Sequence, residues 1–191
     1  MPITEAIQFG LAAAASGALV WAAVSDVRTR RIPNLSVLAL LLLFLCWTGI
    51  HFGAPTLSSL EAAGIALVVT VALYAFKVVG AGDSKLFAVA ALFMGMGYLP
   101  FFALGTALAG GAIAAVSLAS RPQRAMAIFM LRGKGDAGPG VPYGVAIAIG
   151  GIIVLWAMLL GLLDPYGYGQ PAPITVHDIS KALKGGHPGA F

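Results

Sequence analysis

Charge and cysteine are scarce in this sequence. Only 9% of its 191 residues are charged, against about 25% in soluble domains, while 60% are hydrophobic and the mean hydropathy is +0.95. So apolar a chain excludes a water-soluble domain of this size, because the domain could not bury enough of its surface. We therefore expect an all-α membrane protein, since open sheet edges are not tolerated in lipid.

Candidate metal ligands are also few. The lone Cys46 has no disulfide partner in the chain, and no CxxC pair indicates a zinc site. His51, His177 and His187 fall on the predicted outer side or in the tail, as surface residues do. We expect no metal and no cofactor. The net charge of +4 does not predict nucleic-acid binding, because the basic residues flank apolar segments and suit anionic inner-leaflet headgroups.

The apolar runs predict six transmembrane helices in residues 1–163. A spanning helix needs about 20 mostly apolar residues. The expected spans are Ile3–Ser25, Leu35–Phe52, Glu61–Val79, two in Ser84–Ser120 divided at Gly95–Pro100, and Val141–Leu163. No basic residue precedes the first run, so a retained helix is favoured over a cleaved signal peptide. Residues 164–191 are rich in glycine and proline and are expected to form a flexible extracytoplasmic tail.

The basic residues predict the orientation. With six spans, nine of the eleven lysines and arginines fall on one face: Arg28, Arg30, Arg31, Lys77, Lys85, Arg121, Arg124, Arg132 and Lys134. The positive-inside rule makes this face cytoplasmic. Both termini are then extracytoplasmic, and the expected location is the bacterial inner membrane.

Two aspartates are the candidate catalytic residues. Asp26 and Asp83 each lie at the cytoplasmic end of an apolar run, where ionisable groups are costly and tend to mark function. Two adjacent carboxyl groups share one proton, so one can take a proton from water while the other donates to a peptide carbonyl. A structural alternative is that Asp26 pairs with Arg28 or Arg30 and that Asp83 caps the following helix.

The neighbours of the aspartates suggest supporting roles. Gly80 and Gly82 permit an unwound backbone that a substrate can approach closely, although Gly80-Ala81-Gly82 also fits an ordinary helix break. Lys85 either stabilises a charged carboxylate, contacts substrate, or extends to the headgroups. Pro33 and Asn34 are expected to shape a turn that returns the chain beside Asp26.

Three segments, in this order, resemble motifs of the type IV prepilin peptidases, a family of GxGD intramembrane aspartyl proteases. Asp26 followed by Ile32-Pro33-Asn34 is similar to the first-aspartate motif of that family. Gly80-Ala81-Gly82-Asp83, followed by Lys85, is similar to the second. Pro142-Tyr143-Gly144 resembles the segment that opens the last helix.

The resemblance implies an endopeptidase that removes the leader of a prepilin or pseudopilin precursor at the cytoplasmic face. Asp26 and Asp83 match the catalytic positions. The supporting positions are Gly80, Gly82, Lys85, Ile32, Pro33, Asn34, Pro142, Tyr143 and Gly144. Larger members carry paired CxxC motifs and also methylate the product; this chain lacks the motifs and looks like the short, peptidase-only branch of Flp pilus systems.

Two other functions remain open. A small transporter or channel subunit would use Asp26 and Asp83 to carry protons or cations. A structural subunit of a secretion machine would use them only as charges at helix ends. Both alternatives predict that replacing either aspartate leaves precursor processing unchanged.

Overall fold

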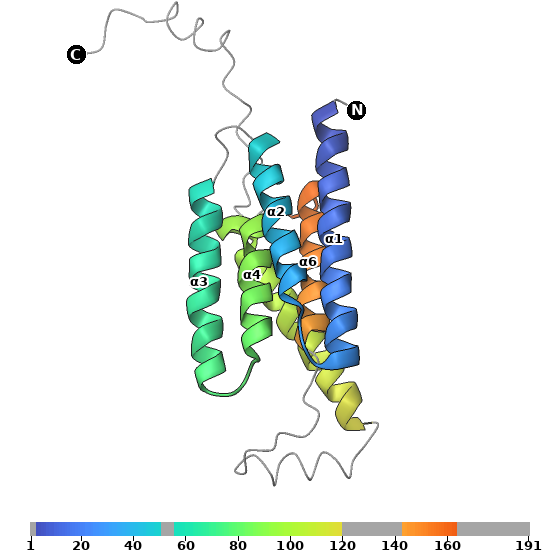
Figure 1. The fold of residues 1–191 in the computed structure, drawn as a ribbon, viewed down its shortest axis with the longest axis vertical. Helices are drawn as coiled ribbons and strands as arrows, with labels where there is room; N and C mark the ends of the chain where they lie inside the picture. Colours follow the sequence, from blue (N-terminus) through green and yellow to red (C-terminus); the bar gives the residue numbers. More distant parts are fainter. Residues whose placement is uncertain (1–2, 51–55, 120–142, 164–191) are drawn as a thin grey trace, which may run out of the picture.

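The helices form an up-and-down bundle. The structure, a computed structural model, describes residues 3–50, 56–119 and 143–163, and its regular elements there are all helical. They are α1 (Ile3–Thr29), α2 (Asn34–Ile50), α3 (Thr56–Ala75), α4 (Ala81–Ala119) and α6 (Tyr143–Leu159) (Figure 1). The predicted all-α class is therefore confirmed for this part of the chain.

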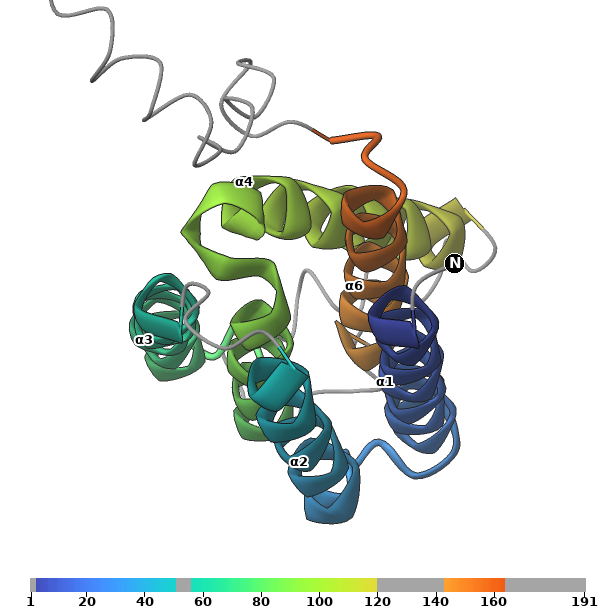
Figure 2. The same ribbon diagram turned by 90° about the horizontal axis from the view of Figure 1, so that it is seen from above.

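Helix α4 is two helical segments joined at a kink. Gly95 has φ 58° and ψ −179°, a conformation that interrupts the helix and favours glycine. The N–H of Met96 donates to Ser58 Oγ of α3 at 3.0 Å, so the kink is anchored to a neighbouring helix. Figure 2 shows the second segment turning away from the first and passing beside α6. The predicted break between Gly95 and Pro100 thus occurs at Gly95, and Pro100 lies inside the second segment.

The bundle has an apolar exterior and a small-residue interior. Leu57, Val68 and Leu104 are more than half exposed, and large aliphatic side chains cover much of the surface. The buried residues include many alanines, such as Ala12 and Ala91, both 0% exposed. Small residues between helices allow their backbones to approach closely, which is how helices pack in lipid. This distribution fits a protein whose solvent is the bilayer.

In the part of the chain that the structure describes, three helices are long and apolar enough to cross a membrane: Glu5–Thr29, Leu57–Ala75 and Ala81–Ser117. Two further apolar helices, Asn34–Gly49 and Tyr143–Leu159, are shorter. The chain is a membrane protein on these grounds, and the count of six spans stays a prediction. The tail of residues 164–191, the basic residues from Arg121 to Lys134, and Pro142 lie outside the described residues.

The predicted motifs gather at one end of the bundle. The end of α1, the start of α2, the start of α4 and the start of α6 all lie at the lower end in Figure 1. Helix α6 packs against both α1 and α4, and α2 packs against α1. Segments that are distant in the sequence therefore meet at this end.

Candidate active site

Asp26 lies in the last turn of α1 and is almost fully buried. The helix continues to Thr29, four residues beyond its predicted end at Ser25, so Asp26 is helical. Its side chain is 7% exposed. The backbone N–H of Gly144, in the first turn of α6, donates to Asp26 Oδ2 at 2.9 Å, and this hydrogen bond is buried.

Gly144 allows this contact because it has no side chain. A Cβ atom at this position would lie 2.9 Å from Asp26 Oδ2 and 3.0 Å from Asp26 Cβ. The first N–H groups of a helix lack partners within the helix, and Asp26 supplies a partner for one of them. The third predicted motif is thereby joined to the first aspartate. The sequence identified Gly144 as a supporting residue but gave no sign of this contact.

Asp83 is the third residue of α4 and is held by a local contact. Its Oδ2 accepts a hydrogen bond from the backbone N–H of Gly80 at 3.2 Å. This is a helix cap, as the structural alternative predicted, but it is formed from inside the first turn. Asp83 Oδ1 is buried and has no hydrogen-bond partner within the part of the chain that the structure describes.

Of the two glycines before Asp83, Gly80 lies between α3 and α4, as a helix break requires, whereas Gly82 differs from expectation. Helix α4 begins at Ala81, three residues before the predicted Ser84, so Gly82 is helical and the chain is not unwound there. Gly82 instead gives room to a neighbour, because a Cβ atom on it would lie 3.3 Å from Ile32 Cβ. The Ile-Pro-Asn motif and the GxGD motif are therefore in contact.

Ser84 is a structural residue at this site that the sequence analysis missed. Its side chain is 3% exposed, and its Oγ lies 3.2 Å from the carbonyl oxygen of Thr70 in α3 and 3.1 Å from that of Gly80. The hydroxyl thus fixes the start of α4 against α3. A serine directly after GxGD, at the start of an apolar run, is the signal that could have indicated it.

The turn between α1 and α2 is fixed by hydrogen bonds to backbone carbonyl groups. Arg30 has φ 55°, and its N–H donates to the carbonyl oxygen of Asp26 at 2.9 Å. The Oγ of Ser25 donates to the carbonyl oxygen of Arg31 at 3.0 Å. The carbonyl oxygen of Pro33 accepts two hydrogen bonds from Ser36, one from its backbone N–H at 3.1 Å and one from its Oγ at 2.8 Å. These hydrogen bonds are at the start of α2. This turn carries Ile32 and Asn34 back beside Asp26.

Both aspartates line one open cavity of about 350 Å³. The other lining residues are Arg30, Arg31, Ile32, Asn34, Gly80, Ala81, Gly82 and Lys85. Five predicted supporting residues are therefore brought to the cavity wall, whereas Pro33, Tyr143 and Gly144 are not among its lining residues. The cavity brings together the ends of α1 and α2 with the start of α4.

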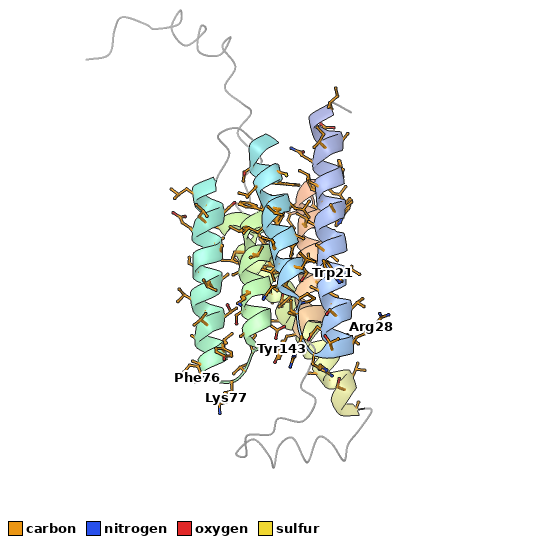
Figure 3. All side chains as sticks on the ribbon, viewed as in Figure 1. Trp21, Arg28, Phe76, Lys77 and Tyr143 are labelled. Atoms are coloured by element: carbon orange, nitrogen blue, oxygen red, sulfur yellow. The ribbon has the colours of Figure 1, made fainter. Side chains whose placement is uncertain are left out.

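The basic residues of the first turn divide into two groups. All three arginines were expected to bind lipid phosphate. Arg30 and Arg31 line the cavity, whereas Arg28 points away from the bundle (Figure 3). Lipid binding therefore stays a prediction, and Arg28 is the arginine best placed for it.

The cavity has the groups needed for acid–base chemistry. Asp26 and Asp83 border the same space. No group of three or more His, Cys, Asp or Glu side chains that could hold a metal ion occurs among residues 3–50, 56–119 and 143–163. Two carboxyl groups beside a space that admits water can act as a general acid and a general base.

The comparison with protein families agrees with the motifs. The model of the type IV leader peptidase family matches residues 13–115. That range contains Asp26, Asp83 and the residues that line the cavity, and it ends before Gly144. No curated protein and no solved structure matches the chain. The resemblance found in the sequence is confirmed by this family match.

Proposed function

The chain belongs to the type IV leader peptidase family and is therefore a membrane peptidase of prepilin leaders, and we propose that Asp26 and Asp83 are its catalytic pair. The observation that carries this proposal is that both aspartates line the same cavity. They come from different helices, α1 and α4, and each is held by a backbone N–H group. Such an arrangement supports an aspartyl mechanism.

The reaction needs one ionised and one protonated carboxyl group. The ionised group takes a proton from water as the water oxygen bonds to the peptide carbonyl carbon. The protonated group gives its proton to the carbonyl oxygen, which produces a neutral diol. The first group then passes its proton to the amide nitrogen, the C–N bond breaks, and the second group regains a proton from a diol hydroxyl. Both carboxyl groups return to their starting states.

The location follows from the distribution of charge. Arg28, Arg30, Arg31, Lys77 and Lys85 flank the same helix ends as the cavity, and the positive-inside rule assigns such an end to the cytoplasm. We propose six spans in the bacterial inner membrane, with both termini outside and anionic inner-leaflet lipids around Arg28. The absence of CxxC pairs in the sequence favours a peptidase-only enzyme that acts on Flp-like prepilins.

Replacement of either aspartate tests the proposal. Asp26→Asn and Asp83→Asn should each abolish conversion of a co-expressed Flp-type prepilin to its shorter form on a gel, because an amide can neither accept nor donate the required proton. Glu61→Gln is the matched control, since Glu61 is an exposed residue of α3 away from the cavity. All three variants should reach the membrane in normal amounts.

The same experiment separates the alternatives. Normal processing by Asp26→Asn or Asp83→Asn would remove that residue from the catalytic pair. If both variants processed the precursor normally, a transport or structural role for the aspartates would replace the hydrolytic one.

A further inference from the structure

The two catalytic aspartates are held in unequal ways. Asp26 Oδ2 receives a buried hydrogen bond from the Gly144 N–H at 2.9 Å. Asp83 Oδ2 receives an exposed hydrogen bond from the Gly80 N–H at 3.2 Å. Asp83 Oδ1 is buried without a hydrogen-bond partner among the described residues. The shorter and better shielded hydrogen bond therefore belongs to Asp26.

The Gly144 N–H favours a negative charge on Asp26. Hydrogen bonds from N–H groups to carboxylates are about twice as strong as those between neutral groups. The first turn of α6 adds the partial positive charge of a helix N-terminus. Burial strengthens both effects, because little water competes for the carboxylate.

Asp83 has the complementary arrangement. A charge on Asp83 would leave its buried Oδ1 without a hydrogen-bond donor among the described residues, which is costly in a buried place. A proton on this oxygen lowers that cost, because it removes the charge, and makes the carboxyl group a donor. Asp83 is also a lining residue of the cavity, so the protonated residue borders the space that a substrate carbonyl would enter.

We propose that Gly144 is a positioning residue that acts through Asp26, holding it as the ionised member of the pair, so that Asp26 is the base and Asp83 the acid. This inference rests on the proposed aspartyl mechanism and assigns its two roles. In the first step, Asp26 takes a proton from water while the water oxygen bonds to the peptide carbon, and Asp83 gives its proton to the peptide oxygen. Neither step needs a further reactant.

Gly144→Ala tests the positioning role. The added Cβ would lie 2.9 Å from Asp26 Oδ2 and 3.0 Å from Asp26 Cβ, so the carboxylate must move. Misplacement of a catalytic group by about 1 Å can lower a rate about 100-fold. With purified enzyme and a purified Flp-type prepilin, we expect kcat to fall about 10- to 100-fold while KM changes less than about twofold. Gly17→Ala in α1 is the control, because nothing lies within 4 Å of its added Cβ, and its kcat should be normal.

A coupling experiment covers the case in which Gly144→Ala unfolds. Asp26→Gly removes the three atoms nearest to the Cβ that Gly144→Ala adds, which are Cβ, Cγ and Oδ2 of Asp26. Gly144→Ala should therefore lower the melting temperature in detergent for the wild type but much less in the Asp26→Gly background. An equal loss of melting temperature in both backgrounds would show that Gly144 and Asp26 are not in contact, and this would overturn the inference.

The outcomes also separate this inference from the proposed function. Normal processing by Asp26→Asn would defeat the aspartyl mechanism as a whole. A normal kcat for Gly144→Ala, in an enzyme that Asp26→Asn inactivates, would defeat only the role given to Gly144. The role of Gly144 would be supported if Gly144→Ala lowered kcat without changing KM and Gly17→Ala left kcat normal. A general structural defect would be expected to change KM as well.

Discussion

The hydrogen bond that holds Asp26 depends on the packing of two helices that are far apart in the sequence, whereas the hydrogen bond that holds Asp83 lies within a single helical turn. The partner of Asp26 is Gly144, in the first turn of α6, and the partner of Asp83 is Gly80, three residues earlier in the chain. A contact within one turn forms wherever that turn forms. A contact between α1 and α6 forms only if α6 sits at the right depth and distance. Changes in helix packing should therefore disturb Asp26 more than Asp83.

Two adjacent glycines of α6 allow this helix to pack closely against its neighbours. A Cβ atom on Gly150 would lie 2.6 Å from Thr106 Oγ1 and 2.7 Å from the Thr106 backbone nitrogen in α4. A Cβ atom on Gly151 would lie 3.2 Å from Leu19 Cδ1 in α1. These positions let α6 approach both neighbours closely, and its first turn then reaches Asp26.

Gly150→Ala should disturb the position of Asp26 but not that of Asp83, and it has the largest expected effect. The new methyl group meets backbone atoms of Thr106, so the two helices must separate. Overpacking of this kind costs about 1–3 kcal/mol, and the displaced α6 would carry Gly144 away from Asp26. We expect a lower melting temperature in detergent together with a loss of prepilin cleavage. Gly64→Ala in α3 is the control, because nothing lies within 4 Å of its added Cβ, and it should change neither quantity. A stable and active Gly150→Ala enzyme would contradict the proposed close packing of α6.

Gly80→Ala should perturb the Asp83 side with a smaller and more local effect. The added Cβ would lie 2.8 Å from Asp83 Oδ2, which is the end of a side chain that can rotate. We therefore expect kcat to fall about tenfold, or about 1.4 kcal/mol in activation free energy, with little change in melting temperature. Steady-state kinetics and thermal unfolding of the same sample measure both quantities. A large loss of stability with normal kcat per folded molecule would show that Gly80 serves folding and not Asp83.

The sequence predicted the elements that depend on local chemistry. Long apolar runs predicted the described helices, with ends that differ by a few residues from those observed. The break in α4 was predicted from Gly95 and Pro100 and lies at Gly95. Asp83 was offered as a helix cap in the structural alternative, and it does cap α4, since the Gly80 contact lies within one turn. Apolar patterning and glycine placement suffice for these features.

Features that depend on tertiary contacts could not be predicted. Nothing near Asp26 in the sequence indicates Gly144 as its partner, because that contact is formed by the packing of α6 on α1. Gly82 was expected to unwind the chain, but its lack of a side chain serves the approach of Ile32. Arg30 and Arg31 line the cavity, where the chain makes a left-handed turn at Arg30, and this placement was not predicted; their expected lipid contact stays a prediction. Each of these outcomes requires knowing which helices are neighbours.

The turns that flank the two aspartates differ in only one respect that matters for the site, so they test the difference between the Asp26 and Asp83 sides with the smallest expected effect. Arg30, after Asp26, has φ 55°, and Lys77, before Asp83, has φ 58°. Both follow the end of a helix, at the position where glycine is preferred. The left-handed conformation costs a residue with a side chain about 1–2 kcal/mol, and a glycine substitution regains part of it. Arg30→Gly and Lys77→Gly should each raise the free energy of unfolding in detergent by about 0.5–1 kcal/mol.

Activity should distinguish these two equally stabilised variants. Arg30 lines the cavity with both aspartates, whereas Lys77 is not among its lining residues. Arg30→Gly should therefore lower prepilin cleavage a few-fold while it stabilises the protein, and Lys77→Gly should stabilise the protein and leave cleavage unchanged. Thermal unfolding and steady-state cleavage, measured on both variants, supply the comparison. Equal cleavage by the two variants would mean that the Arg30 side chain contributes nothing at the cavity, and that the left-handed turn serves only to return Ile32 and Asn34 to Asp26.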